Sequence, residues 1–181
     1  MQAKGSIALD ASCLLMSLVK FVSPTDPRWL STLDAVGRLL ASDALVRRYD
    51  VGESADEDGL GSTEGSFTVC SFWYVECLAR AGRVDAARLR FDKLLSYANH
   101  LGLYAEELGP AGDHLGKFPQ ALTHPALISA AYALDRALDD DEARGWRAGA
   151  GARQGGEGGC GGPRPRAVSR ARSCRSAREP S

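Results

Sequence analysis

The 181-residue sequence has no long apolar run and no stretch in which apolar and polar residues alternate. A membrane-spanning helix needs about 18 consecutive apolar residues, and no segment reaches that length. The first residues, Met1-Gln-Ala-Lys-Gly-Ser6, lack the charged and then apolar layout of a secretory signal peptide. The absence of alternation argues against β-strands. We therefore expect an all-α protein of the cytoplasm, with no membrane partner.

Metal-binding and disulfide patterns are also missing. None of the five cysteines forms a Cys-x-x-Cys pair, and His100, His114 and His124 lack the spacing of metal ligands. Cys70 and Cys77 would lie about 10.5 Å apart along a helix axis, which is too far for a disulfide. We expect these two cysteines to be small core residues in a reducing compartment, and we expect no metal and no cofactor.

The net charge of −1 hides two segments of different composition. Residues 1–144 contain 14 Lys and Arg against 21 Asp and Glu, whereas residues 145–181 contain 8 Arg against 2 Glu. The second segment also holds nine of the 20 glycines and few bulky apolar residues, so it cannot bury enough surface to fold. We predict one helical domain over residues 1–142 and a disordered Gly/Arg-rich tail over residues 143–181.

An arginine-rich tail is also typical of nucleic-acid-binding arms. This tail has no lysine, and Trp146 is its single aromatic residue, which argues against that role. Its bias toward Gly, Arg, Ala, Pro and Ser equally fits a GC-rich message read in a shifted frame. We expect no nucleic-acid partner, and a tail that is either disordered or non-native.

The helical spacing of apolar residues predicts about five helices. Their expected ranges are 8–22, 27–40, 64–81, 84–98 and 120–139, with loops over 46–63 and 99–119. Asp26 and Pro27 are a typical cap and first-turn pair, and Gly82 is typical of a helix end. The helix over 64–81 is apolar on nearly every side, whereas that over 84–98 has one charged side. This alternation suggests the inner and outer layers of a helical toroid.

The most informative segment is the loop Leu101-Gly-Leu-Tyr-Ala-Glu-Glu-Leu-Gly-Pro110, which carries two adjacent carboxylates between helices. It resembles the C-terminal part of glycoside hydrolase family 15, the glucoamylase and bacterial trehalase family. Three other segments carry the same resemblance in the family's order: Ala8-Leu-Asp-Ala-Ser12, Glu64-Gly-Ser-Phe-Thr-Val-Cys-Ser-Phe-Trp73, and Phe118-Pro-Gln-Ala121 followed by His124. Each segment is weak alone, but four in order between residues 5 and 140 are fairly specific.

The resemblance implies the C-terminal part of an (α/α)6 catalytic domain, with about five of its twelve helices. It also implies hydrolysis of α-glucosidic bonds with inversion, in an α-linked gluco-oligosaccharide or in trehalose. In that reaction one carboxylic acid protonates the leaving oxygen, and a second carboxylate activates a water on the opposite face of the sugar. Glu106 falls where the family places the general base. We find no counterpart of the general acid in this chain.

Neighbouring side chains of an extended segment point to opposite sides, so we expect at most one of Glu106 and Glu107 to face the substrate at full depth. The resemblance assigns Glu107 to substrate binding, and it implies that Arg48, or alternatively Arg47, donates to sugar hydroxyls. Without the resemblance, the two glutamates would be solvated loop acids and Arg48 a solvated cation at a helix end.

Further substrate contacts are expected from Glu64, Tyr104 and Gln120. Glu64 is alternatively a first-turn acid favoured by the helix dipole. Tyr104 is the better candidate for a platform under the sugar, whereas we expect Trp73 in the core. Gln120 would hold a sugar hydroxyl and His124 would orient the loop, and for both residues the alternatives are helix capping and core hydrogen bonding.

Two other interpretations follow from the same residues. The segment Gly82-Arg-Val-Asp-Ala-Ala-Arg88 is also common in helical-repeat modules that bind peptides, although no 34-residue period is present. The chain could otherwise be a truncated, non-functional gene product. Half a toroid leaves buried helices in water, so we expect self-association through the exposed core, and no hydrolysis of maltooligosaccharides or trehalose by the chain alone.

Overall fold

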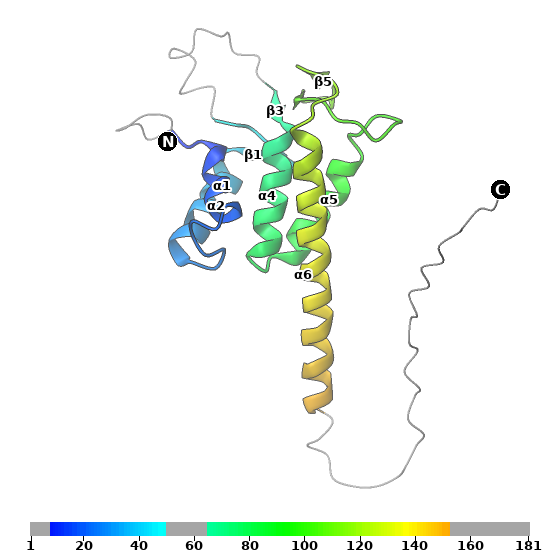
Figure 1. Ribbon diagram of the computed structural model, residues 1–181. Helices are drawn as coiled ribbons and strands as arrows, with labels where there is room; N and C mark the ends of the chain where they lie inside the picture. Colours follow the sequence, from blue (N-terminus) through cyan, green and yellow to red (C-terminus); the bar gives the residue numbers. More distant parts are fainter. Residues whose placement is uncertain (1–7, 50–64, 153–181) are drawn as a thin grey trace, which may run out of the picture.

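The computed structural model describes residues 8–49 and 65–152, and its architecture is mostly helical, as predicted (Figure 1). No helix within these ranges is both long enough and apolar enough to cross a membrane. The helices are η1 Ala11–Leu14, α1 Leu15–Leu18, α2 Pro27–Leu39, α4 Thr68–Arg80, α5 Val84–Leu95 and α6 Thr123–Ala152.

The expectation of no strands is wrong in detail. The described residues include five strands of two residues each: β1 Ala41–Ser42, β2 Leu45–Val46, β3 Ser66–Phe67, β4 Glu107–Leu108 and β5 His114–Leu115. β1 pairs with β2, and β4 lies between β3 and β5 in a second sheet, with all pairs antiparallel. A strand of two residues is too short to show alternation, so the sequence pattern does not reveal it.

Helix α4 is the buried centre of the fold, as its apolar sequence predicts. Eleven of its 13 residues are buried, and it packs against α1, α2, α5 and α6. The helix begins at Thr68 rather than at residue 64, because Ser66 and Phe67 are extended and pair with β4. Glu64 itself lies outside the described residues.

The ends of the other helices follow local signals. Asp26 caps α2 by accepting a hydrogen bond from Arg28 N at 2.9 Å, and Pro27 opens the helix, as predicted. The expected helix over 8–22 is instead the short pair η1 and α1, because the chain turns at Lys20, which has a φ of 63°. Helix α5 ends at Leu95, three residues before its predicted end.

Helix α6 runs from Thr123 to Ala152, past its predicted end at residue 139 and past the predicted domain boundary. The segment after residue 139 has no proline before Pro163 and is rich in Ala and Arg, which are good helix formers. A helix therefore continues there without an apolar periodicity. The rest of the predicted tail, residues 153–181, lies outside the described residues.

The helices form the layers expected of a partial toroid. Helix α4 lies between α1 and α2 on one side and α5 and α6 on the other (Figure 1). The amphipathic α2 and α5 each bury one side, whereas α4 is buried almost completely. The first turns of α4 and α6 meet at one end of the fold, beside the short strands (Figure 1). The residues of the loop between α5 and α6 are therefore brought to the start of both helices.

Candidate active site

The loop between α5 and α6 is held by the first residues of α4 and by the start of α6. Thr68 N donates to Glu106 O at 3.0 Å, and Gln120 N donates to Tyr104 O at 2.9 Å. The carbonyl of Ala105, between these two residues, accepts a hydrogen bond from the Thr123 hydroxyl at 3.4 Å. The carbonyls of Tyr104, Ala105 and Glu106 are thus bonded to Gln120, which precedes α6, and to the first residues of α6 and α4. The main chain at Glu106 therefore has a fixed position.

The Glu106 side chain is half-buried and lies against the turn formed by Gly116 and Lys117. Glu106 N donates to Lys117 O at 2.9 Å, and Lys117 N donates back to Glu106 Oε2 at 3.2 Å. Gly116 has a φ of 70°, and a Cβ at this position would lie 3.0 Å from Glu106 Oε2. The turn therefore needs glycine for its backbone conformation and also for the space that the carboxylate occupies.

Glu107 has a different environment from its neighbour. It lies in β4, between Phe67 of β3 and Leu115 of β5. Its Oε2 accepts a hydrogen bond from Gly65 N at 2.9 Å. The two adjacent carboxylates thus bind different segments, and Glu107 ties the chain before β3 to the sheet.

Arg48 lies at the same end of the molecule as the two acids. Its guanidinium carbon is 5.8 Å from the centre of the Phe67 ring, and Phe67 pairs with Glu107 in the sheet. The main chain is fixed there, because Arg48 O accepts a hydrogen bond from Ala11 N at 2.7 Å. Arg47 Nη2 instead donates to the last carbonyl of α2 at 3.2 Å. Arg48 thus lies over the ring that pairs with Glu107, and Arg47 lines a hollow together with Gly65, Ser66 and Leu108, so both arginines lie beside the sheet that holds Glu107.

Tyr104 lies in the core and does not form a surface on which a sugar could stack. Its side chain is 1% exposed, and its ring packs edge-to-face on Phe72 at 5.3 Å between centroids. Its hydroxyl donates to Leu94 O at 3.2 Å, and burial raises the pKa of this hydroxyl above its ordinary value. Tyr104 is therefore not the stacking surface for a sugar that the sequence predicts, because its ring packs against apolar residues of the core.

The remaining predicted residues surround the start of α6. His124 Nδ1 lies 2.8 Å from Gln120 O, and the His124 ring contacts Tyr104 at 6.0 Å between centroids. Gln120 is half-buried, next to the loop that it binds through its main chain. Trp73 packs partly buried against the core, as expected.

Sequence reasoning missed the residues that hold Glu106 in place. Thr68, Thr123, Gly116 and Lys117 all touch the loop, and none of them was singled out. Their bonds use main-chain atoms or a threonine hydroxyl, so residue type alone carries little signal. Gly116 is the one residue type among them that carries a signal in the sequence, because glycine is favoured where φ is positive, as at turns.

The fold is part of a larger helical toroid of the glycosidase type. A solved structure described as a wild-type glycosidase aligns with a TM-score of 0.60 and 22% identity, over 72% of this chain and 37% of that chain. A glycosidase variant in complex with glucose aligns with a TM-score of 0.58 and 21% identity, over the same shares of the two chains. At this identity, the likeness defines the fold class.

Sequence comparison then defines the family. The family model described as glycosyl hydrolases family 15 matches residues 1–132. The chain belongs to this family, as its four segments predict. The family match removes the basis for the alternative of a helical-repeat module.

Several curated relatives carry the name trehalase. The trehalase of Mycobacterium tuberculosis is 48% identical over 145 residues, which is 80% of this chain and 21% of that protein. The trehalase of Thermoplasma acidophilum is 40% identical over 139 residues, which is 76% of this chain and 23% of that protein. The chain therefore spans between a fifth and a quarter of the length of these relatives.

Proposed function

We propose that this chain carries the general-base part of an inverting, trehalase-type glycosidase, and that Glu106 is the base. The observation that supports this role is the way in which Glu106 is held. Its main chain is bonded to Thr68 and Lys117, and its Oε2 accepts a hydrogen bond from Lys117 N. A carboxylate has about four lone-pair positions, so this bond leaves others for a water. A fixed carboxylate beside a water is what general-base catalysis requires.

Trehalose is the proposed substrate, because the relatives named above are trehalases. Glu106 would take a proton from the water while the water oxygen attacks the anomeric carbon. The glycosidic oxygen would leave with a proton from an acid on the opposite face. The two carboxyl groups of inverting glycosidases lie roughly 6.5–9.5 Å apart, with the sugar between them. Glu107 does not suit the acid's role, because it is adjacent to Glu106 and bonded to Gly65.

The general acid is proposed to come from the part of the trehalases that this chain does not span. Arg48 and Gln120 are the proposed contacts to sugar hydroxyls, because Arg48 lies over Phe67, which pairs with Glu107, and Gln120 binds the loop at Tyr104. Both side chains have polar ends suited to hydroxyl groups. Glu64 is proposed as a third contact, and Glu107 would support it through Gly65, the residue that follows Glu64.

A chimera tests the assignment of the base. Residues 1–142 would replace the matched segment of the Mycobacterium tuberculosis trehalase, which is similar enough for the exchange at 48% identity. We expect the chimera to hydrolyse trehalose, and we expect Glu106→Gln to lower kcat by about 10²–10⁴-fold. Glu107→Gln is the matched control and should lower stability more than kcat. Full activity of the Glu106→Gln chimera would contradict the proposal, and a folded but inactive parent chimera would favour a non-functional gene product.

The stereochemical part of the proposal has its own test. Inversion at one glucose of α,α-trehalose releases one β-glucose and one α-glucose, whereas retention releases α-glucose alone. Proton NMR at early times, before mutarotation, distinguishes these outcomes. The isolated chain should show no turnover of trehalose or maltooligosaccharides. Turnover by the isolated chain that disappears in Glu106→Gln would show that no further acid is needed.

A further inference from the structure

The guanidinium of Arg48 lies over two aromatic rings that come from different parts of the fold. Its central carbon is 5.7 Å from the centre of the Tyr49 ring and 5.8 Å from the centre of the Phe67 ring. Both distances are within the roughly 6 Å at which the face of a ring attracts a cation. Arg48 itself is exposed, and a long exposed side chain has many rotamers in water. The two contacts therefore restrict where the guanidinium lies.

The Tyr49 ring belongs to a segment that is fixed to the start of the fold. Tyr49 pairs with Asp10 in an antiparallel bridge, and Ala11 N donates to Arg48 O at 2.7 Å. Asp10 is buried, and its carboxylate caps η1 by accepting a hydrogen bond from Ser12 N at 2.7 Å. The main chain at Arg48 and Tyr49 thus has a fixed position, so the place of the guanidinium depends on its side-chain rotamer.

The Phe67 ring belongs to the sheet beside the candidate base. Phe67 lies in β3 and pairs with Glu107 of β4. The next residue, Thr68, donates its N–H to Glu106 O at 3.0 Å. The guanidinium of Arg48 is therefore connected to the main chain of Glu106 through one ring and one hydrogen bond. A contact that holds Arg48 on Phe67 also sets its position relative to Glu106.

The ring contacts leave the hydrogen-bond donors of Arg48 available. A guanidinium carries five N–H donors in its own plane, and a cation–π contact uses its charge rather than these donors. Within residues 8–49 and 65–152, neither an ion pair nor a hydrogen bond engages the Arg48 guanidinium. Arg47, in contrast, donates from Nη2 to Leu39 O at 3.2 Å. Arg48 thus combines a restricted position with donors that are open to a ligand.

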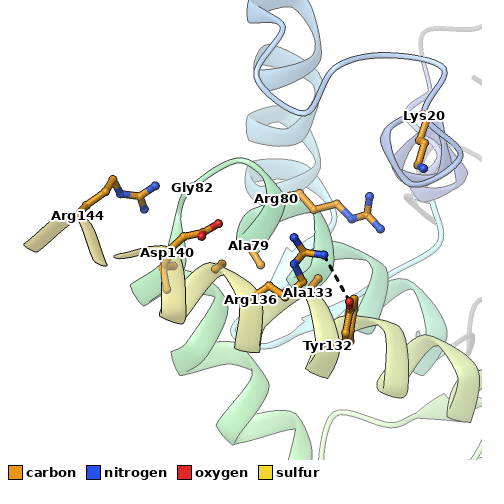
Figure 2. A pocket seen from close by; sticks show the side chains of 11 residues that line it. Lys20, Ala79, Arg80, Gly82, Tyr132, Ala133, Arg136, Asp140 and Arg144 are labelled. Atoms are coloured by element: carbon orange, nitrogen blue, oxygen red, sulfur yellow. Dashed lines mark hydrogen bonds between the residues drawn. The ribbon is translucent and has the colours of Figure 1, made fainter. Parts of the chain in front are cut away.

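A pair on α6 provides a comparison. The guanidinium carbon of Arg136 is 5.8 Å from the centre of the Tyr132 ring, and Arg136 Nη1 donates to the Tyr132 hydroxyl at 3.4 Å (Figure 2). The pair lines a hollow that contains none of the predicted site residues. It has the same kind of ring contact in another place, so it is a matched control for Arg48 and its rings.

We infer that Phe67 and Tyr49 are positioning residues, whose rings hold the Arg48 guanidinium with its donors open to the hydroxyl groups of the sugar. The inference rests on the proposed role of Arg48 as a contact to sugar hydroxyls. A guanidinium that is already held in one place loses less conformational entropy when it binds these hydroxyls. Leucine in place of Phe67 or Tyr49 offers apolar surface but no ring face, so it cannot replace the contact.

Kinetics of the trehalase chimera described above test the inference. Phe67→Leu and Tyr49→Leu should each raise the KM for trehalose about 2–5-fold and change kcat little, because a contact that is equal in the ground state and the transition state affects KM alone. Phe67→Tyr and Tyr49→Phe keep a ring and should behave as the parent chimera. Tyr132→Leu is the matched control and should leave KM unchanged. An unchanged KM in both leucine variants, or no recovery with the ring-keeping variants, would overturn the inference.

Trehalose analogues that each lack one hydroxyl group separate positioning from a general loss of packing. Arg48→Met should remove the discrimination against the analogue that lacks the hydroxyl bound by Arg48, since no donor is then left unpaired. Phe67→Leu should reduce the same discrimination and leave that at the other hydroxyls unchanged. If Phe67→Leu instead lowers kcat/KM by one common factor for every analogue, the ring acts through packing alone and the inference is wrong.

Side-chain dynamics of the full chain test the inference without any activity. In nitrogen-15 NMR relaxation, the Nε–H order parameter of Arg48 should exceed that of Arg88, whose side chain is 65% exposed. Arg48→Lys removes one Nε signal and so assigns it. Phe67→Leu and Tyr49→Leu should each lower the order parameter of Arg48, and Tyr132→Leu should not. Equal order parameters for Arg48 and Arg88 would refute the positioning role.

Failure of the proposed function has a different signature. An active Glu106→Gln chimera, or a folded parent chimera that neither cleaves nor binds trehalose, would contradict the proposed function and leave the order parameters of Arg48 as expected. In that case the rings hold Arg48 but its ligand is not trehalose. An active parent chimera with a mobile Arg48 would instead keep the proposed function and overturn the role of the two rings.

Discussion

Replacing Gly116 by alanine tests whether the turn before Lys117 positions the Glu106 carboxylate. The φ of 70° at Gly116 costs an L-residue about 1–2 kcal/mol. The new Cβ would lie 3.0 Å from Glu106 Oε2 and 3.1 Å from Glu106 Cβ, so the glutamate has to shift, which weakens its bond to Lys117 N. This bond is exposed, and we assign it about 0.5–1 kcal/mol. We therefore expect Gly116→Ala to lower the free energy of unfolding by about 1.5–3 kcal/mol in urea denaturation followed by circular dichroism.

Gly102 provides the matched control for this experiment. Its φ is 75°, and no atom lies within 4 Å of the position that a Cβ would take. Gly102→Ala has the same backbone cost and the same effect on the unfolded chain, so the difference between the two variants reports the contact with Glu106. Adding Glu106→Ala to Gly116→Ala should remove part of this difference, because alanine lacks the carboxylate but keeps the Cβ that lies 3.1 Å from the new methyl group. Equal destabilisation by Gly102→Ala and Gly116→Ala, or additivity in the double variant, would refute the positioning role.

Two further perturbations test the core beneath the site. Phe72→Ala should lower the free energy of unfolding by about 3–5 kcal/mol, because Phe72 is fully buried between the Tyr104 and Phe91 rings. Phe72→Leu, the control, should lower it clearly less. A loss below about 1 kcal/mol for the alanine variant would contradict this packing. Burial also raises the pKa of the Cys77 thiol. The unfolded thiol releases its proton above about pH 8.5 while the folded thiol keeps it, so stability should fall as the pH rises further, by at most about 1.4 kcal/mol per pH unit for this group. Cys77→Ala should have a shallower fall in urea titrations at increasing alkaline pH, and an unchanged slope would count against the buried thiol as its source.

The parts of the fold that sequence predicts are those with local signals. The apolar run from Phe67 to Leu78 marks the central helix, and Asp26 with Pro27 marks the start of α2. The start of α4 is not local, because the pairing of Phe67 with Glu107 joins residues 40 positions apart. Such a pairing leaves no periodicity in either segment, so the sequence pattern alone places the start of α4 too early.

The candidate site also has one part that the sequence predicts and one part that only the structure shows. The loop sequence points to Glu106 through its resemblance to a family, and the structure adds the atoms that hold it. The direction of Tyr104 depends on Phe72 and Leu94, which lie elsewhere in the chain and draw the ring into the core. Inward or outward placement of an aromatic residue in a loop is a property of the packing around it, which no short segment encodes.

The bonds described for Glu106 have one consequence for inheritance. Their partner atoms all belong to the stretch from Thr68 to Thr123, together with the loop itself. A gene segment that keeps this stretch intact transfers the Glu106 carboxylate with its geometry already set. A recombination breakpoint inside the stretch separates Glu106 from Thr68 or from Lys117, so its product retains the acidic side chain but loses the frame that orients it.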